Sequence, residues 1–175
     1  MKAVKNIILR PIGIIHSEHK EAENTPIQPV FAKGCRGVAI VYPEYAEGLK
    51  DIDGFSHLYL LYYFHKAGPA SLMVKPFLDD EERGVFACRH PCRPNHIGMS
   101  LVKMVKREGN KLILEGVDIL DGTPLLDIKP FKPQFDIVKK ARSGWMGKID
   151  LKAAKKRGLR DYSKKGAGIG IKIKI

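Results

Sequence analysis

The sequence lacks most features that would place it in a membrane, secreted or disulfide-rich class. It has only three cysteines among 175 residues, an odd number that argues against a disulfide scaffold. No apolar run approaches the roughly 20 residues that span a bilayer, since the longest, residues 58–64, has the length of a strand. The first residues show no secretory signal. We therefore expect a cytoplasmic protein without a membrane segment.

Common nucleotide-binding and hydrolase motifs are missing as well. The sequence contains no Walker A loop and no Gly-x-Ser-x-Gly nucleophile motif. The string Gly168-Ile-Gly170 lies near the C-terminus in a strand-like pattern with no helix after it, which argues against a Rossmann dinucleotide site. A nucleotide-like cofactor would therefore have to bind to a surface of another kind.

Acidic residues are scarce at one end of the chain. Residues 137–175 contain 13 lysines and arginines against 2 acidic residues, whereas residues 1–136 contain 18 against 17. Nearly all of the net charge of +12 therefore lies in the last 39 residues. A near-neutral body with a basic end favours contact with a polyanion such as RNA. A solvated tail without a partner is the alternative.

Short apolar runs between turn residues predict about nine strands and only short helical turns. We expect strands at residues 6–16, 37–42, 55–65, 72–74, 84–88, 97–105, 111–120, 125–128 and 169–175, with helical turns at 43–49 and 150–157. The run 55–65 is continuously apolar, which predicts burial on both faces. The predicted fold is all-β: a compact β-barrel over residues 1–136, with a basic C-terminal extension over 137–175 that packs on or extends the barrel.

The segment 84–100 contains polar residues at positions where packing alone would not require them, and it is therefore a candidate binding site. Arg89, Arg93 and Asn95 lie between two apolar runs, and the prolines at 91 and 94 stiffen the passage. Arginine forks suit carboxylates and phosphates, although they also cap loop carbonyls. The string Cys88, His90, Cys92, His96 suggests zinc, but an extended, proline-stiffened segment is poorly suited to wrap one ion, so no metal site is predicted.

Three further positions have possible roles in binding. His65 ends the aromatic run beside Lys66, and Gln28 lies in a proline-bounded loop with no evident core task. The turn Asp121-Gly122-Thr123 is either a plain hairpin turn or a loop that offers backbone N–H groups to a ligand.

Several strings, in this order along the chain, resemble the TsaA/YaeB-like family, also called the TrmO family. They are Arg10-Pro-Ile-Gly-Ile-Ile-His-Ser17, Pro26-Ile-Gln28, Gly54-Phe-Ser-His-Leu58, Phe64-His65, Gly84-Val-Phe-Ala87 with Arg89, Arg93-Pro-Asn95, Ile97-Gly-Met-Ser100 and Asp118-Ile-Leu-Asp-Gly-Thr-Pro-Leu-Leu-Asp-Ile-Lys-Pro130. The resemblance covers about residues 8–136.

The resemblance implies a homodimeric β-barrel that binds S-adenosylmethionine without a Rossmann fold. It also implies a tRNA methyltransferase that modifies the exocyclic nitrogen of threonylcarbamoyl-adenosine in the anticodon loop, with tRNA held in part by the basic tail. Carried over by position, the cofactor contacts would be Pro26, Ile27, Gln28, His65, Lys66, Arg89, Leu101, Leu120, Asp121, Gly122 and Thr123. Arg93 and Asn95 would organise the loop.

In the implied reaction the protein mainly has to align the sulfonium methyl group with the attacking nucleophile, because that methyl group is already activated. A base would help the attacking nitrogen to lose its proton, and His65 is the favoured candidate, although no catalytic residue can be named. Tyr62, Tyr63 or Trp145 could stack on a splayed base. Bacterial tRNA-modifying members carry a longer C-terminal region with an Asp-Pro-Arg-Pro motif that this chain lacks. A non-catalytic S-adenosylmethionine-binding module and an RNA-binding barrel therefore remain as alternatives.

Overall fold

The computed structural model describes residues 7–150, which form eight strands, one short α-helix and five 3-10 turns. The strands are β1 Gly13–Ser17, β2 Arg36–Val41, β3 His57–Tyr63, β4 Met73–Val74, β5 Arg83–Gly84, β6 Ile97–Glu108, β7 Lys111–Glu115 and β8 Thr123–Pro130. The helix α1 is Pro133–Asp136, and the 3-10 turns are Pro29–Phe31, Pro43–Leu49, Ile52–Gly54, Val85–Ala87 and Gly144–Lys148.

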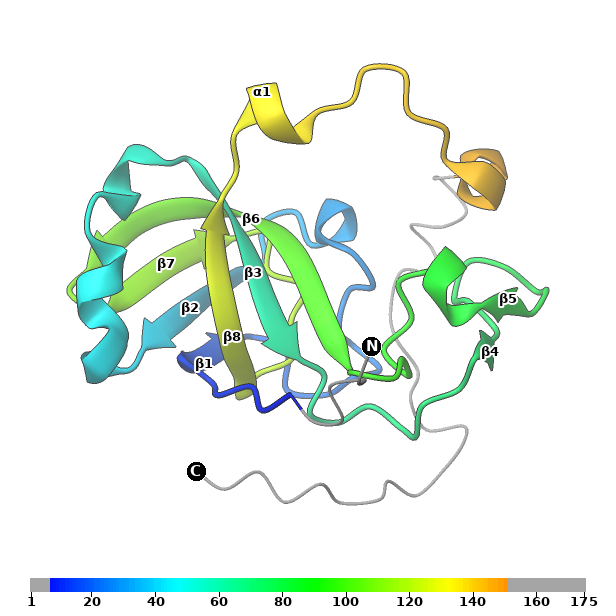
Figure 1. Ribbon diagram of the computed structural model, residues 1–175, viewed down its shortest axis with the longest axis horizontal. Helices are drawn as coiled ribbons and strands as arrows, with labels where there is room; N and C mark the ends of the chain where they lie inside the picture. Colours follow the sequence, from blue (N-terminus) through cyan, green and yellow to red (C-terminus); the bar gives the residue numbers. More distant parts are fainter. Residues whose placement is uncertain (1–6, 151–175) are drawn as a thin grey trace, which may run out of the picture.

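Six of the strands form a closed antiparallel barrel in the order β1-β2-β7-β6-β3-β8 (Figure 1). Closure depends on β1, which pairs with β2 on one side and with β8 on the other. Ile15, for example, lies opposite Ala39 in β2 and Thr123 in β8. A closed barrel leaves no unpaired edge, which satisfies the backbone of many short strands at once. The predicted all-β barrel is confirmed.

The barrel interior is filled by alternate side chains of each strand. In β3, Leu58, Leu60 and Tyr62 are buried while the residues between them are half-buried. The prediction that this strand is buried on both faces was therefore wrong. In a closed barrel only one face of a strand can point inward, and on the outer face of β3 Tyr59 packs edge-on against Phe131.

The element boundaries agree with the sequence pattern best where a turn residue fixes them. The β6–β7 hairpin turns at Gly109, whose φ of 61° suits glycine. The strand expected at 84–88 is instead β5 followed by a 3-10 turn, and the first strand spans only Gly13–Ser17. The strand predicted at 169–175 and nearly all of the helix predicted at 150–157 lie outside the described residues.

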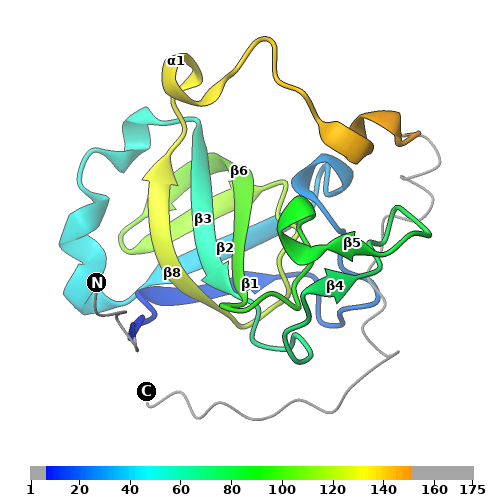
Figure 2. The same cartoon turned by 45° about the vertical axis from the view of Figure 1, so that its right-hand side comes forward.

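A second, smaller cluster lies beside the barrel. Strands β4 and β5 pair with each other, and Val74, Val85 and Cys88 form a separate apolar core with Trp145 packed against it. Figures 1 and 2 both show the Gly144–Lys148 turn, in orange, next to the segment around β5. The start of the basic extension therefore packs on this cluster. Within residues 7–150, no helix is long and apolar enough to be a membrane span.

Candidate ligand-binding site at the barrel mouth

A hydrogen bond between two distant segments defines the centre of the site. Arg89 Nη1 donates to Gln28 Oε1 at 2.9 Å, which joins the loop after β1 to the loop before β6. Both residues were predicted as cofactor contacts. Arg89 is exposed, so its guanidinium keeps donors free to face a ligand while one of them holds Gln28 in place.

A second contact joins two other predicted positions. Thr123 Oγ1 donates to the carbonyl of Leu120 at 2.6 Å, and His65 Nδ1 lies 3.3 Å from the same hydroxyl. Since the hydroxyl proton is used, the imidazole donates from Nδ1 and presents Nε2 as an acceptor. Burial lowers the pKa of His65, and the charge of Lys66 adds to this effect. His65 is therefore neutral at pH 7 and able to accept a proton.

Three adjoining hollows surround these contacts. The central chamber, about 420 Å³, is lined by Gln28, Arg89 and Arg93 together with Tyr62, Phe64, Met99 and Asp118. A side pocket shares Tyr62 and Phe64 with it and is lined by His65, Lys66, Leu120 and Thr123. An aromatic chamber of about 270 Å³ shares Gln28, Cys88 and Arg89 with the central chamber and also contains Ile27, Phe77, His90 and Trp145.

The floor of the central chamber has a polar chain that the sequence reasoning missed. Ser100 Oγ donates to Asp118 Oδ1 at 2.5 Å, and the Tyr62 hydroxyl, 3.0 Å from Ser100 Oγ, therefore donates to it. All three side chains are buried. A Cβ on Gly98 would lie 2.2 Å from the Tyr62 ring, so glycine is needed for the ring to lie there. The sequence feature that could have indicated this chain is Asp118, a single acidic residue between the apolar residues Val117 and Ile119.

Asp121 is held by three donors and is not part of the lining of the three hollows. Its carboxylate accepts from the Ser17 backbone N–H at 3.0 Å and the His16 imidazole at 3.2 Å, and it pairs with Lys20 at 2.8 Å. Burial opposes ionisation, but the contacts with Lys20, Ser17 and His16 outweigh it and lower the pKa of Asp121 to about 2. The residue thus fastens the turn before β8 to the end of β1.

The turn at Asp121 offers fewer donors than one reading of the sequence suggested. The N–H of Asp121 donates to the His19 carbonyl at 2.8 Å, and the N–H of Gly122 donates to the Ile15 carbonyl at 2.9 Å. Neither N–H is therefore available to a ligand, and the idea that this turn presents them was wrong. The turn instead extends the β1–β8 junction.

Two other predicted contacts lie outside the three hollows. Pro26 is buried in the loop after β1. Leu101 lies on the outer face of β6, two residues beyond Met99 and opposite Tyr59 in β3. Burial, and then the carboxylate of Asp136, raises the pKa of Tyr59. The positive charge of Arg89 opposes this rise, so Arg89 lies near the outer face that carries Tyr59 and Leu101. A cofactor contact for Leu101 stays a prediction.

The proline-rich loop 88–96 is organised by its own polar groups. Arg93 Nη1 donates to the carbonyls of Cys88 and His90 at 3.2 and 3.4 Å, as expected for an organising residue. His90 Nδ1 accepts from the Cys92 N–H at 3.2 Å, and His96 Nε2 donates to the Gly68 carbonyl at 3.0 Å. The residues of the zinc-like string thus have separate roles.

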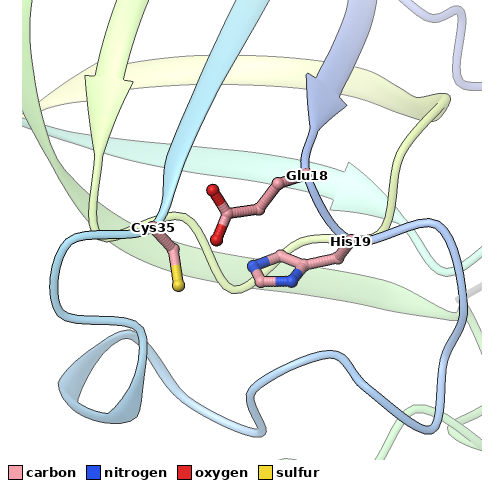
Figure 3. Close-up of side chains that lie close together, drawn as sticks. All are labelled: Glu18, His19 and Cys35. Atoms are coloured by element: carbon pink, nitrogen blue, oxygen red, sulfur yellow. The ribbon is translucent and has the colours of Figure 1, made fainter.

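Among residues 7–150, the one group of three potential metal ligands within 4.8 Å of one another is Glu18, His19 and Cys35 (Figure 3). His19 Nε2 donates to the Val117 carbonyl at 2.9 Å, and the Arg36 N–H donates to Glu18. Burial, and then the neighbouring Glu18, raises the pKa of Cys35 to about 11. The thiol therefore keeps its proton at neutral pH, and we assign the group to fastening the start of β2.

The fold of residues 7–150 and the candidate site define a class: a closed antiparallel barrel with arginine-bearing hollows at its mouth and, in that range, no Rossmann unit. The model of the family described as the tRNA-methyltransferase O N-terminal domain matches residues 14–137. The chain belongs to this family.

Similar proteins extend from archaea to mammals. A probable S-adenosyl-L-methionine-binding protein of Pyrococcus abyssi is 53% identical over 151 residues, which cover 86% of this chain and 82% of the relative. An S-adenosyl-L-methionine-binding protein of Archaeoglobus fulgidus is 41% identical over 132 residues, 75% of this chain and 94% of that protein. The human tRNA (adenine(37)-N6)-methyltransferase is 36% identical over 75% of this chain, but the match covers only 31% of the human protein.

The fold is also found in a solved relative. The crystal structure of TrmO from Pseudomonas aeruginosa superposes with a TM-score of 0.68 and is 39% identical, over 80% of this chain and 62% of that chain. This chain therefore spans about three fifths of the length of the solved enzyme.

The contacts of Asp121 predict a pH-dependent contribution to stability. Because its folded-state pKa of about 2 lies below the ordinary value of 3.8, the stabilisation is fully present above pH 4 and is lost as the pH falls through 2. We expect Asp121→Asn to lower the free energy of unfolding by roughly 1–2 kcal/mol at pH 6, and by much less at pH 2.5.

Urea unfolding at the two pH values measures the difference. Asp80→Asn is the matched control, since the Asp80 carboxylate is exposed and pairs only with Lys75 among the described residues. An equal loss of stability at both pH values for Asp121→Asn would contradict the assigned role.

Proposed function

We propose that this protein binds S-adenosylmethionine at the barrel mouth and transfers its methyl group to an exocyclic adenine nitrogen in tRNA. The observation that carries the proposal is the gathering of Gln28, Arg89, His65 and Thr123 from four separate segments around one set of connected hollows. Family membership supports it, as do the names of relatives that bind this cofactor or methylate tRNA.

The residues present suit the chemistry of this cofactor. Arg89 would hold its carboxylate, since a guanidinium is a strong partner for that group. The Asp118 carboxylate is the acidic group that lines the central chamber and would favour the positive end of the ligand. Phe64, Met99 and Leu120 supply apolar and aromatic surface for the adenosyl part.

For this reaction the protein has to align the methyl group of the cofactor with the acceptor nitrogen and to remove one proton from that nitrogen. When bound, S-adenosylmethionine would supply an activated methyl group for the nitrogen, with the neutral thioether as its leaving group. The nitrogen must release its proton. His65, neutral and fixed through Nδ1, is the described side chain best suited to accept that proton at Nε2. Exclusion of water by the apolar walls would strengthen each contact.

The specific substrate that we propose is threonylcarbamoyl-adenosine of threonine tRNA, as the family resemblance implies.

A specific observation favours a second function. A module that binds the cofactor without catalysis is the alternative, which the name of the S-adenosyl-L-methionine-binding protein of Archaeoglobus fulgidus, matched over 94% of its length, supports.

We also propose that the protein acts as a homodimer in the cytoplasm. Met99 and Phe86 line the central chamber yet are 50% and 74% exposed, and Leu101 follows Met99 on the same face of β6. A second copy over this face would cover these residues and bring Leu101 against the cofactor region. Sedimentation equilibrium tests this, with a monomeric mass at micromolar concentration as the opposing result.

Arg89→Ala is expected to weaken cofactor binding by about 10- to 100-fold without unfolding the protein, because a charge-assisted contact to a carboxylate contributes roughly 1.5–3 kcal/mol. Calorimetric titration with S-adenosylmethionine measures this, with Arg36→Ala as the exposed arginine control. An unchanged affinity in Arg89→Ala would oppose the assignment. Methyl transfer to threonine tRNA that carries the modified adenosine would eliminate the non-catalytic alternative.

Truncation after Asp150 is expected to weaken RNA binding and to leave cofactor binding unchanged. The deletion removes nine lysines and arginines and one aspartate. Fewer phosphate contacts mean a shallower dependence of RNA affinity on salt. Filter binding at 50 and 200 mM salt measures both. If affinity and salt slope equal those of the full chain, the basic end is a solvated tail instead.

A further inference from the structure

The aromatic chamber includes one predicted cofactor contact that the other two hollows lack, Ile27, but its rings have no role in the cofactor binding proposed above. It opens beside the central chamber, and Gln28 and Arg89 belong to the walls of both. Gln28, Arg89 and Cys88 therefore lie between a ligand in one chamber and a ligand in the other, and Gln28 and Arg89 are hydrogen-bonded to each other. The geometry suggests two ligand sites that meet at one partition.

The rings of the chamber are held in fixed orientations. Phe77 and His90 stack with their ring centroids 5.6 Å apart and an interplanar angle of 13°. The Trp145 indole donates to the Ala87 carbonyl at 2.8 Å, and the Arg83 guanidinium lies 5.4 Å above its ring. Rings fixed in advance lose little entropy when a flat ligand stacks on them.

The chain around Trp145 carries unpaired positive charge. Lys139, Lys140, Arg142 and Lys148 are exposed, and none of them forms an ion pair with another residue in the range 7–150. Aromatic surfaces interleaved with free basic side chains are the combination that binds single-stranded nucleic acid, because the bases stack while the phosphates meet the charges.

We propose that the aromatic chamber is the binding site for a nucleobase splayed out of RNA, with Phe77, His90 and Trp145 as its stacking walls. The inference deepens the proposed function, on which it rests, by locating the acceptor base. The base would lie against the Gln28–Arg89 partition, and the four basic side chains of 139–148 would hold the flanking phosphates. Arg83 is less suited to that task, because it already pairs with Asp79 and Glu81.

Trp145 gives a direct readout, because it is the only tryptophan in the sequence. The probes are a synthetic anticodon stem-loop with adenosine 3′ to the anticodon and the same RNA with that nucleotide made abasic. We expect the adenosine RNA to quench Trp145 fluorescence on binding, and the abasic RNA to bind with a similar salt dependence but without quenching. Equal quenching by both RNAs would overturn the proposal.

S-adenosylmethionine alone is the second probe, and it should leave Trp145 emission nearly unchanged. Quenching by the cofactor that RNA reverses would assign the chamber to the cofactor and overturn the inference, while the proposed activity would stand. Base-dependent quenching in a protein that transfers no methyl group would have the opposite meaning: the base site would be supported and the activity would fail.

Phe77→Leu keeps apolar volume but removes the flat ring. Stacking contributes about 1–3 kcal/mol per base, so the affinity for the adenosine RNA should fall by about 5- to 150-fold, with the affinity for the abasic RNA and for the cofactor unchanged. Phe55→Leu is the matched control, since Phe55 follows the Ile52–Gly54 turn on the side of the barrel away from β4 and β5 (Figure 1). Wild-type RNA affinity in Phe77→Leu would overturn the proposal.

Discussion

The pairing of β1 with both β2 and β8 is the constraint on which the rest of the structure depends. It closes the barrel, and it places the loop after β1 next to the turn before β8. Asp121 strengthens this junction through Ser17, His16 and Lys20. Without closure, Gln28 and Thr123 would have no fixed relation to each other, since about 95 residues of chain separate them.

A second constraint acts inside the barrel mouth. The chain of hydrogen bonds from Tyr62 through Ser100 to Asp118 links β3, β6 and the connection after β7 below the central chamber. Each buried donor in this chain has an acceptor, so burial does not leave an unsatisfied group. A floor of this kind holds a carboxylate in position under a ligand without mobile surface residues, and the missing side chain at Gly98 gives the Tyr62 ring its place.

In the function proposed here, the two chambers divide the work that a methyl transfer requires. Arg89 and Gln28 belong to both, so one hydrogen bond both positions the arginine and forms the partition. Both chambers contain Cys88 and Arg89 of the segment after β5, but Phe77 of the β4–β5 insertion and Trp145 of the basic extension line only the aromatic chamber of the two. If the aromatic chamber binds the acceptor, changes at Phe77 and Trp145 would alter the choice of acceptor while the barrel stays the same.

The sequence by itself determined most of the strand pattern of the barrel and the family, because alternation, turn residues and long motif strings are local properties of a chain. It also singled out Arg89, Gln28, His65 and Thr123. Only the tertiary structure decided that β3 is buried on one face, that the N–H groups of Asp121 and Gly122 are already used, and that Trp145 lies beside Phe77 and His90. These outcomes depend on which distant segments meet when the barrel closes, and local sequence pattern does not encode such long-range contacts.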